Sequence, residues 1–96
     1  MDEKIVQTIM KTIVECYLNE ECDSSEAVCK LLKYVDLLDL LDSSVSTFTT
    51  DCYYAIKHLT ETGYETTKIE LGYFMDCFTG TRKYDVDEKN KLLSGK

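Results

Sequence analysis

The chain has 96 residues and a mass of 11.1 kDa, which allows one compact domain with a single hydrophobic core. Hydrophobic residues make up 44% and charged residues 30%, a balance that excludes general disorder. The net charge of −7 and the lack of a basic stripe argue against direct binding to nucleic acid or to an anionic membrane. They favour a protein partner with a basic patch or an apolar groove.

The first predicted element is an amphipathic helix over residues 4–19. Its apolar residues recur at the three-and-four spacing of a helix face, and they are Ile5, Val6, Ile9, Met10, Ile13, Val14 and Tyr17. A second helix is predicted after Asp23, which forms a capping-box pattern with Glu26. On a helical wheel, its apolar residues as far as Leu38 form one arc, and its charged residues form the opposite, polar arc. Leu32, Leu37 and Leu40 fall on or beside that polar arc. This helix is therefore either buried on two sides or offers leucines to another molecule.

Three further helices are predicted. One begins in the Val45–Thr50 region and ends before Gly63. Residues 64–79 have an alternating apolar pattern that allows a strand, but their spacing also fits a helix. We favour the helix, because a lone strand would have no sheet partner. Its predicted signals are a Thr67/Glu70 capping box and an end at Gly80. Residues 85–93 are either a short docked helix or part of a frayed, locally basic tail.

The fold class that follows is all-α. Short separations between the segments predict an antiparallel four-helix bundle, with or without a short fifth helix at the C-terminal end. A six-helix, death-domain-like arrangement is the nearest alternative. We expect residues 1–96 to form one helical domain.

The cysteines predict free thiols. Five residues, with no CxxC pair, suit a reducing cytoplasmic compartment better than a disulfide framework. We also expect no secretory signal and no membrane span. Cys16, Cys22 and Cys29 with His58 provide four zinc-type ligands, but their spacing matches no standard zinc pattern. We therefore expect no metal and no other cofactor.

Catalysis has little support in the sequence. The one histidine, His58, lies seven residues after Asp51 on a similar helix face, so a carboxylate could orient the imidazole. No spacing selects a nucleophile, and there is no phosphate-binding loop. We expect the chain not to be an enzyme.

The string Leu37-Leu38-Asp39-Leu40-Leu41-Asp42 is the strongest candidate for partner binding. It contains the LxxLL pattern with which an amphipathic helix enters an apolar groove, although a buried bundle helix would show the same leucines. Adjacent tyrosines cannot both face inward from one helix, so at least one of the pair at 53–54 should be exposed. The predicted partner-binding residues are Asp36, Leu37, Asp39, Leu40, Leu41, Asp42, Tyr53 and Tyr54.

Acidic residues cluster between positions 15 and 42, a segment that contains eight acidic residues and two lysines. In size and charge only, the chain resembles small acidic inhibitors from phages, including anti-CRISPR proteins, which imitate phosphates and occupy a basic groove. A solvated helix face explains the same cluster. The expected function is a small acidic inhibitor or adaptor, in viral or phage counter-defence or as an antitoxin or immunity protein. The alternative is a structural homodimer joined through its leucines.

Overall fold

Helices are the regular elements of the computed structural model, which describes residues 2–42, 45–61 and 64–94. The all-α prediction is confirmed, and within these residues no strand is present. The side chains of Asp39, Leu41, Asp42 and Tyr64 lie outside what is described.

The first two helices begin as their sequences predict. Helix α1 (Glu3–Leu18) is capped by Asp2, and α2 (Ser24–Tyr34) is capped by Asp23. The Asp23 carboxylate accepts a hydrogen bond from the Glu26 backbone N–H at 2.9 Å, while the Glu26 carboxylate accepts one from the Asp23 N–H at 3.4 Å. This reciprocal arrangement is the predicted capping box.

The predicted second helix is interrupted at Val35 and Asp36. Val35 has extended backbone angles and is buried, and a separate short helix, α3 (Leu37–Asp42), follows. The Asp36 carboxylate accepts the Leu38 N–H at 2.8 Å and so satisfies a free donor at the start of α3. The change of direction explains why the leucines did not fit one helical arc, because they belong to two helices.

The next segment starts later than Val45. Helix α4 (Thr47–Lys57) has Ser46 as its N-cap and passes into a 3-10 turn, η1 (His58–Thr60). Local hydrogen bonding by Ser and Thr delays the helix start, as their chemistry predicts. The expected end at Gly63 lies outside the described residues.

Residues 64–78 are helical, which settles the choice between helix and strand. Helix α5 (Tyr64–Phe78) already runs through Thr67, so the predicted Thr67/Glu70 capping box is wrong. Thr67 is instead buried, and its hydroxyl lies 3.3 Å from that of Tyr17 in α1. Gly80 follows α5 with φ +82°, the left-handed conformation that its predicted role requires.

The C-terminal segment is a docked helix and not a frayed tail over its described length. In α6 (Val86–Leu93), Asp85 is the N-cap and accepts the N–H groups of Asp87 and Glu88 at 2.9 and 3.4 Å. The Glu88 carboxylate pairs with Arg82 instead of closing a capping box.

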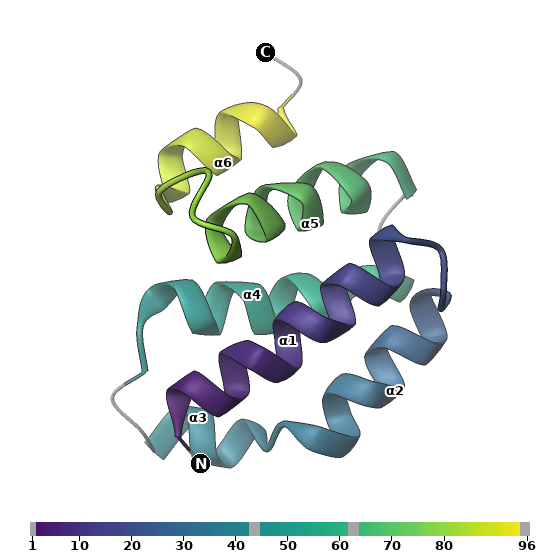
Figure 1. Cartoon of the computed structure of the whole chain (residues 1–96), viewed down its shortest axis with the longest axis vertical. Coiled ribbons are helices and arrows are strands. Elements are labelled where there is room, and N and C mark those ends of the chain that lie inside the picture. The colour runs from purple at the N-terminus through teal and green to yellow at the C-terminus, as the bar shows by residue number, and fades with distance from the viewer. Residues whose placement is uncertain (1, 43–44, 62–63, 95–96) are drawn as a thin grey trace.

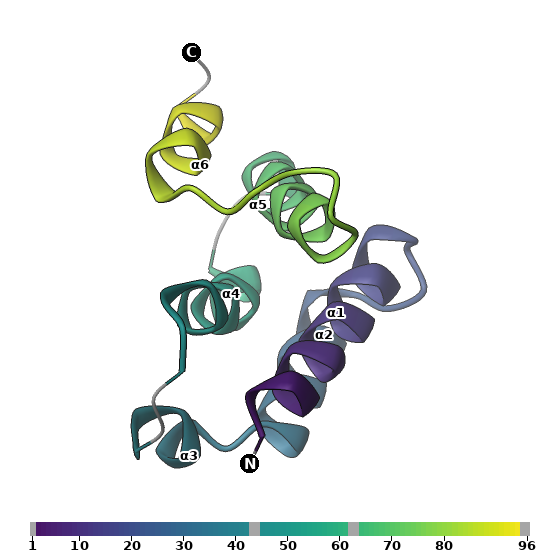
Figure 2. The same cartoon turned by 60° about the vertical axis from the view of Figure 1, so that its left-hand side comes forward.

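Helix α1 is central to the packing, because it contacts α2, α4 and α5, while α6 packs on α5 (Figure 1). Figure 2 shows α3 beneath α4 and α1, and α6 at the opposite end of the molecule, so the two ends of the described chain lie far apart. One hydrophobic core joins these helices. Its largest fully buried side chains are Tyr53, Phe74, Met10, Leu31, Ile56 and Leu71.

Candidate interaction surface

The predicted partner-binding residues divide between surface and interior. Asp36 is exposed, Leu37 is partly buried, and Tyr54 is 37% exposed. Leu40 and Tyr53 are buried in the core, where burial also raises the pKa of the Tyr53 hydroxyl. Burial corrects the expectation for Leu40, because its side chain packs into the core and not toward a partner. The side chains of Asp39, Leu41 and Asp42 lie outside the described residues.

The burial of Leu40 also changes the reading of the LxxLL string. A docking LxxLL helix presents its leucines outward, whereas Leu40 points into this domain and Leu37 packs partly against the core. Among the described side chains of α3, Leu38 is exposed, at 67%. The prediction that at least one of Tyr53 and Tyr54 is exposed is confirmed, because Tyr54 is exposed and Tyr53 is buried.

An apolar groove runs between α1 and α2. We call it the α1/α2 groove, and its lining residues are Thr8, Ile9, Thr12, Ile13, Lys30 and Tyr34, around a hollow of about 310 Å³. Past Thr8 and Ile9 it continues to Ile5 and Lys4 at the start of α1. Past Thr12 and Ile13 it reaches Cys16, Glu15 and Glu21 at the other end. The groove therefore follows most of the length of α1.

A second hollow adjoins this groove at Tyr34. It lies where α2 gives way to α3 and α4, encloses about 580 Å³, and is lined by Leu32, Lys33, Asp36, Leu37 and Lys57 among others. Leu32 and Tyr34 are both more than half exposed. Three of the predicted residues, Asp36, Leu37 and Tyr53, thus line a larger hollowed surface.

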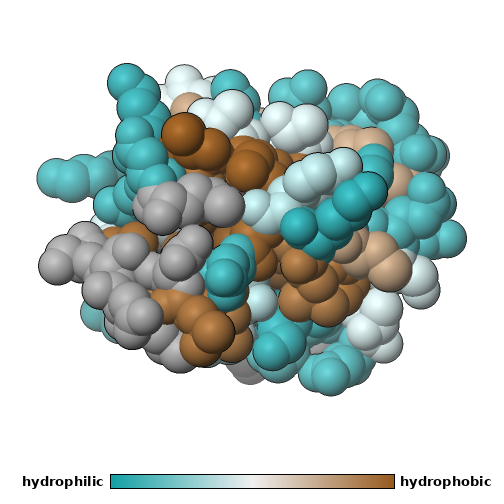
Figure 3. Space-filling model, turned by 90° about the horizontal axis from the view of Figure 1, so that it is seen from below, coloured by the Kyte–Doolittle hydropathy of each residue, from teal (hydrophilic) through white to brown (hydrophobic). Residues whose placement is uncertain are grey.

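The end of the molecule that carries α3 and the beginning of α1 shows a gathering of apolar side chains, with polar groups around it (Figure 3). Ile5, at 54% exposed, and Leu38 are the large apolar side chains that α1 and α3 leave open to solvent. Contiguous apolar surface of this kind marks interaction sites more often than single exposed residues do.

The acidic cluster is split by the fold. Glu20, Glu21, Asp23 and Glu26 line a hollow of about 430 Å³ at the turn between α1 and α2. Asp36 lies at the other end of α2, where its carboxylate caps α3. Among the described side chains of the cluster, negative charge therefore concentrates near the turn between α1 and α2, and Asp36 lies apart from it.

The residues considered for catalysis are not brought together. The His58 ring contacts the Glu61 carboxylate at 2.8 Å and stacks on Tyr54. Asp51 binds Lys89 and Tyr84, so the carboxylate that contacts the imidazole is that of Glu61 and not that of Asp51. Within the described part of the chain, no three His, Cys, Asp or Glu side chains are grouped to hold a metal ion.

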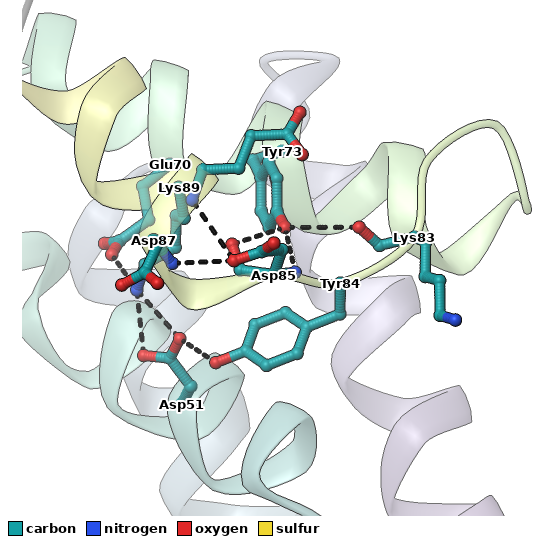
Figure 4. A network of polar contacts seen from close by, with 9 residues as sticks. Asp51, Glu70, Tyr73, Lys83, Tyr84, Asp85, Asp87 and Lys89 are labelled. Carbon is teal, nitrogen blue, oxygen red and sulfur yellow. Dashed lines mark hydrogen bonds and ion pairs between the residues drawn. The ribbon is translucent and has the colours of Figure 1, made fainter.

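Lys89 forms a buried ionic network that joins α4, α5 and α6 (Figure 4). Its ammonium donates to both carboxylate oxygens of Asp51, at 2.9 and 2.8 Å, and to Glu70 at 3.0 Å. The Tyr84 hydroxyl donates to Asp51 at 2.7 Å, and the Lys89 ammonium lies 5.3 Å from the centre of the Phe74 ring. Because the side chains satisfy one another, the network holds helices together and offers no open reactive group.

Sequence reasoning missed the α1 side of the groove, although a signal was present. At 100° per residue, the apolar residues of α1 from Ile5 to Val14 spread over about 180° of the helix. Val6, Met10 and Val14 are buried, while Ile5 and Ile9 lie at one edge of this arc and line the groove. An arc wider than one packing face indicates a second apolar surface.

Comparison with protein-family models finds no matching family, and comparisons with curated proteins and with solved structures find no match. Among the residues that the structure describes, no helix combines the length and apolar character needed to cross a membrane.

Proposed function

We propose that this chain is a protein-binding module that acts as an inhibitor or adaptor by docking onto a larger protein. The observation that carries the proposal is the apolar α1/α2 groove, together with the hollow of mixed polarity that adjoins it at Tyr34. Exposed Ile5 and Leu38 extend it at one end of the molecule. An amphipathic helix of a partner suits such a groove, because its apolar side chains fill the floor while its polar face stays in water.

The acidic residues at one end of the groove indicate how a partner would be oriented along it. Glu15 and Glu21 line one end of the groove, and Glu26 lies in the neighbouring acidic hollow. A partner with basic side chains at that end gains attraction, mainly as faster association that salt weakens. The partner we propose therefore combines an apolar helix face with basic residues near the α1–α2 turn.

The proposed action needs no reaction. Asp51, the carboxylate considered for catalysis, takes part in the Lys89 network, and the His58 ring is held between Glu61 and Tyr54. The cysteines are free thiols, which supports action in a reducing intracellular compartment. Counter-defence in a virus or phage, and neutralisation of a toxin, are the settings in which small acidic proteins act by occupying a partner's surface.

A homodimer is the second candidate, favoured by the exposure of Leu32 and Leu38. Sedimentation velocity at increasing salt separates the two. The docking proposal predicts a monomer at every salt concentration, whereas a leucine-mediated dimer persists or strengthens as salt rises. A salt-tolerant dimer that Leu38→Ser dissociates would replace the docking proposal with self-association.

Affinity capture from native host cells tests the docking surface. The Tyr34→Ser variant should no longer capture the partner, because Tyr34 lines both the groove and the adjoining hollow. The matched control is Ile69→Ser on α5, which removes an exposed apolar side chain elsewhere. Equal capture by Tyr34→Ser and the wild-type chain would contradict the proposed surface.

A further inference from the structure

Two cysteines meet at the turn between α1 and α2. The Glu21 N–H donates to the Cys16 carbonyl at 2.9 Å and the Glu20 N–H to the Tyr17 carbonyl at 3.1 Å, the paired bonds of a Schellman motif. Glu20 takes the left-handed conformation, with φ +62°, that reverses the chain here. The reversal returns Cys22 toward the end of α1, where the Cys16 thiol is one of the groups that raise the pKa of the Cys22 thiol.

A lysine from α2 completes the cluster. The Lys30 ammonium lies 3.6 Å from the Cys16 sulfur, within hydrogen-bonding distance for sulfur. The negative charge of a Cys16 thiolate raises the pKa of Lys30, so cation and thiolate stabilise each other. Burial, with the neighbouring Cys16, raises the pKa of the Cys22 thiol to about 11. The geometry thus gives the two thiols different surroundings, with the Lys30 ammonium beside Cys16 and burial around Cys22.

Cys16 is also reachable. It is half-buried and lines a hollow of about 180 Å³ with Thr12, Glu15, Glu21 and Lys30. The carboxylates of Glu15 and Glu21, together with nearby Glu26, oppose a second negative charge and repel anionic reagents. A small neutral electrophile is the reagent that this hollow admits.

We propose that Cys16 and Cys22 form a thiol redox site whose substrate is hydrogen peroxide or a small organic hydroperoxide. The site lies at the Cys16 end of the α1/α2 groove and shares Lys30 with it, but its chemistry does not require a docked partner. The Cys16 thiolate attacks a peroxide oxygen, an S–O bond forms, and the O–O bond breaks to leave a sulfenic acid and hydroxide or alkoxide, which takes up a proton. The Cys22 thiol then attacks the Cys16 sulfur, the S–S bond forms, the S–O bond breaks, and water leaves with the thiol proton. The two thiols are oxidised and the peroxide is reduced.

Alkylation rates test the activated thiol. At neutral pH, iodoacetamide should modify Cys16 faster than Cys29, although Cys29 is the more exposed. Lys30→Met should slow alkylation of Cys16 by about threefold and leave Cys29 unchanged, because the thiolate loses its counter-charge. Lys33→Met, one turn away in the same helix, is the control that should change neither rate. Faster modification of Cys29, or an unaltered Cys16 rate in Lys30→Met, would overturn the proposal.

Peroxide treatment tests the disulfide. Cleavage after glutamate separates Cys16, in residues 16–20, from Cys22, in residues 22–26, so only a disulfide keeps these peptides together. We expect that linked pair as the main product of one equivalent of hydrogen peroxide. Cys22→Ser should instead stop at a sulfenic acid on Cys16 that dimedone traps. Oxidation spread over the other cysteines, or no linked pair, would contradict the assignment.

Discussion

Replacing Lys89 with methionine removes the ammonium that three buried contacts hold in place, while keeping much of the side-chain volume. The change leaves the carboxylates of Asp51 and Glu70 close together without their cation, at 24% and 20% side-chain exposure. Breaking a buried ion pair costs about 3–5 kcal/mol, and the partial exposure of the two acids places this case near about 3 kcal/mol. That is a large part of the roughly 5–14 kcal/mol expected for a domain of this length.

Urea denaturation followed by circular dichroism measures this loss. A companion chain with Lys89→Met, Asp51→Asn and Glu70→Gln removes the stranded charges and should recover a substantial part of the stability. Burial alone lowers the pKa of Lys89, but the hydrogen bonds from Asp51 and Glu70 outweigh it and the net pKa is raised. The contribution is therefore complete at neutral pH and is lost only as pH rises above 10.5, lysine's ordinary value, through the raised folded pKa. A cost below about 1 kcal/mol for Lys89→Met would refute the argument that this network joins the helices.

Other substitutions test local features, with urea or thermal unfolding as the measurement. Gly80→Ala should lower the free energy of unfolding by about 1 kcal/mol, because Gly80 has a positive φ that alanine disfavours. Gly72→Ala, inside α5 and with no atom near the added Cβ, should raise it by about 0.5–1 kcal/mol. Equal effects of the two substitutions would contradict the left-handed turn at Gly80. Hydrogen bonds from the Thr49 and Ser46 hydroxyls and the Ser46 N–H lower the pKa of Glu3, so the stability they provide is present above pH 4.5 and lost as pH falls below it. Glu3→Gln should flatten that acid dependence, and an unchanged profile would exclude the link between α1 and α4. Leu40→Ala should cost about 2 kcal/mol or more and Leu38→Ala close to nothing; a reversed order would show that α3 faces the other way.

The features that sequence predicted well are those set by neighbours along the chain. The helix predicted over 4–19 is observed as α1, and Asp23, Glu26 and Gly80 have their predicted cap roles. Each depends on spacing within a few residues, which a pattern of side-chain types records directly. The break at Val35 and Asp36 was missed because neither glycine nor proline marks it and the apolar pattern continues across it.

The features that sequence missed depend on partners distant in the chain. Lys89 is one of the cations of a locally basic tail, yet it is buried because Asp51 and Glu70, 38 and 19 residues away, meet it. Thr67 had the pattern of a cap but is inside α5, where it contacts Tyr17 of α1. Tertiary contacts of this kind override local preference.

The candidate surface shows the same division. Two residues of the predicted partner-binding string, Asp36 and Leu37, line a hollow, and at least one of the two adjacent tyrosines is exposed, as the sequence indicated. It could not show that Leu40 turns inward, because the direction of α3 depends on the break before it. Nor could it show that Ile9 lines a groove with α2, or that Ile5 lines the hollow next to it, since the groove requires the pairing of two helices.

The docking of α1 is tested most directly by the dissociation constant for the captured partner, measured by titration calorimetry with two charge substitutions at exposed isoleucines. Ile5→Glu places a carboxylate at the groove, and Ile69→Glu places the same group on α5 at similar exposure. We predict that Ile5→Glu weakens binding about 30-fold or more, about 2 kcal/mol for desolvating a charge against apolar groups, while Ile69→Glu binds as the wild-type chain does. Equal dissociation constants for the two variants would contradict the account.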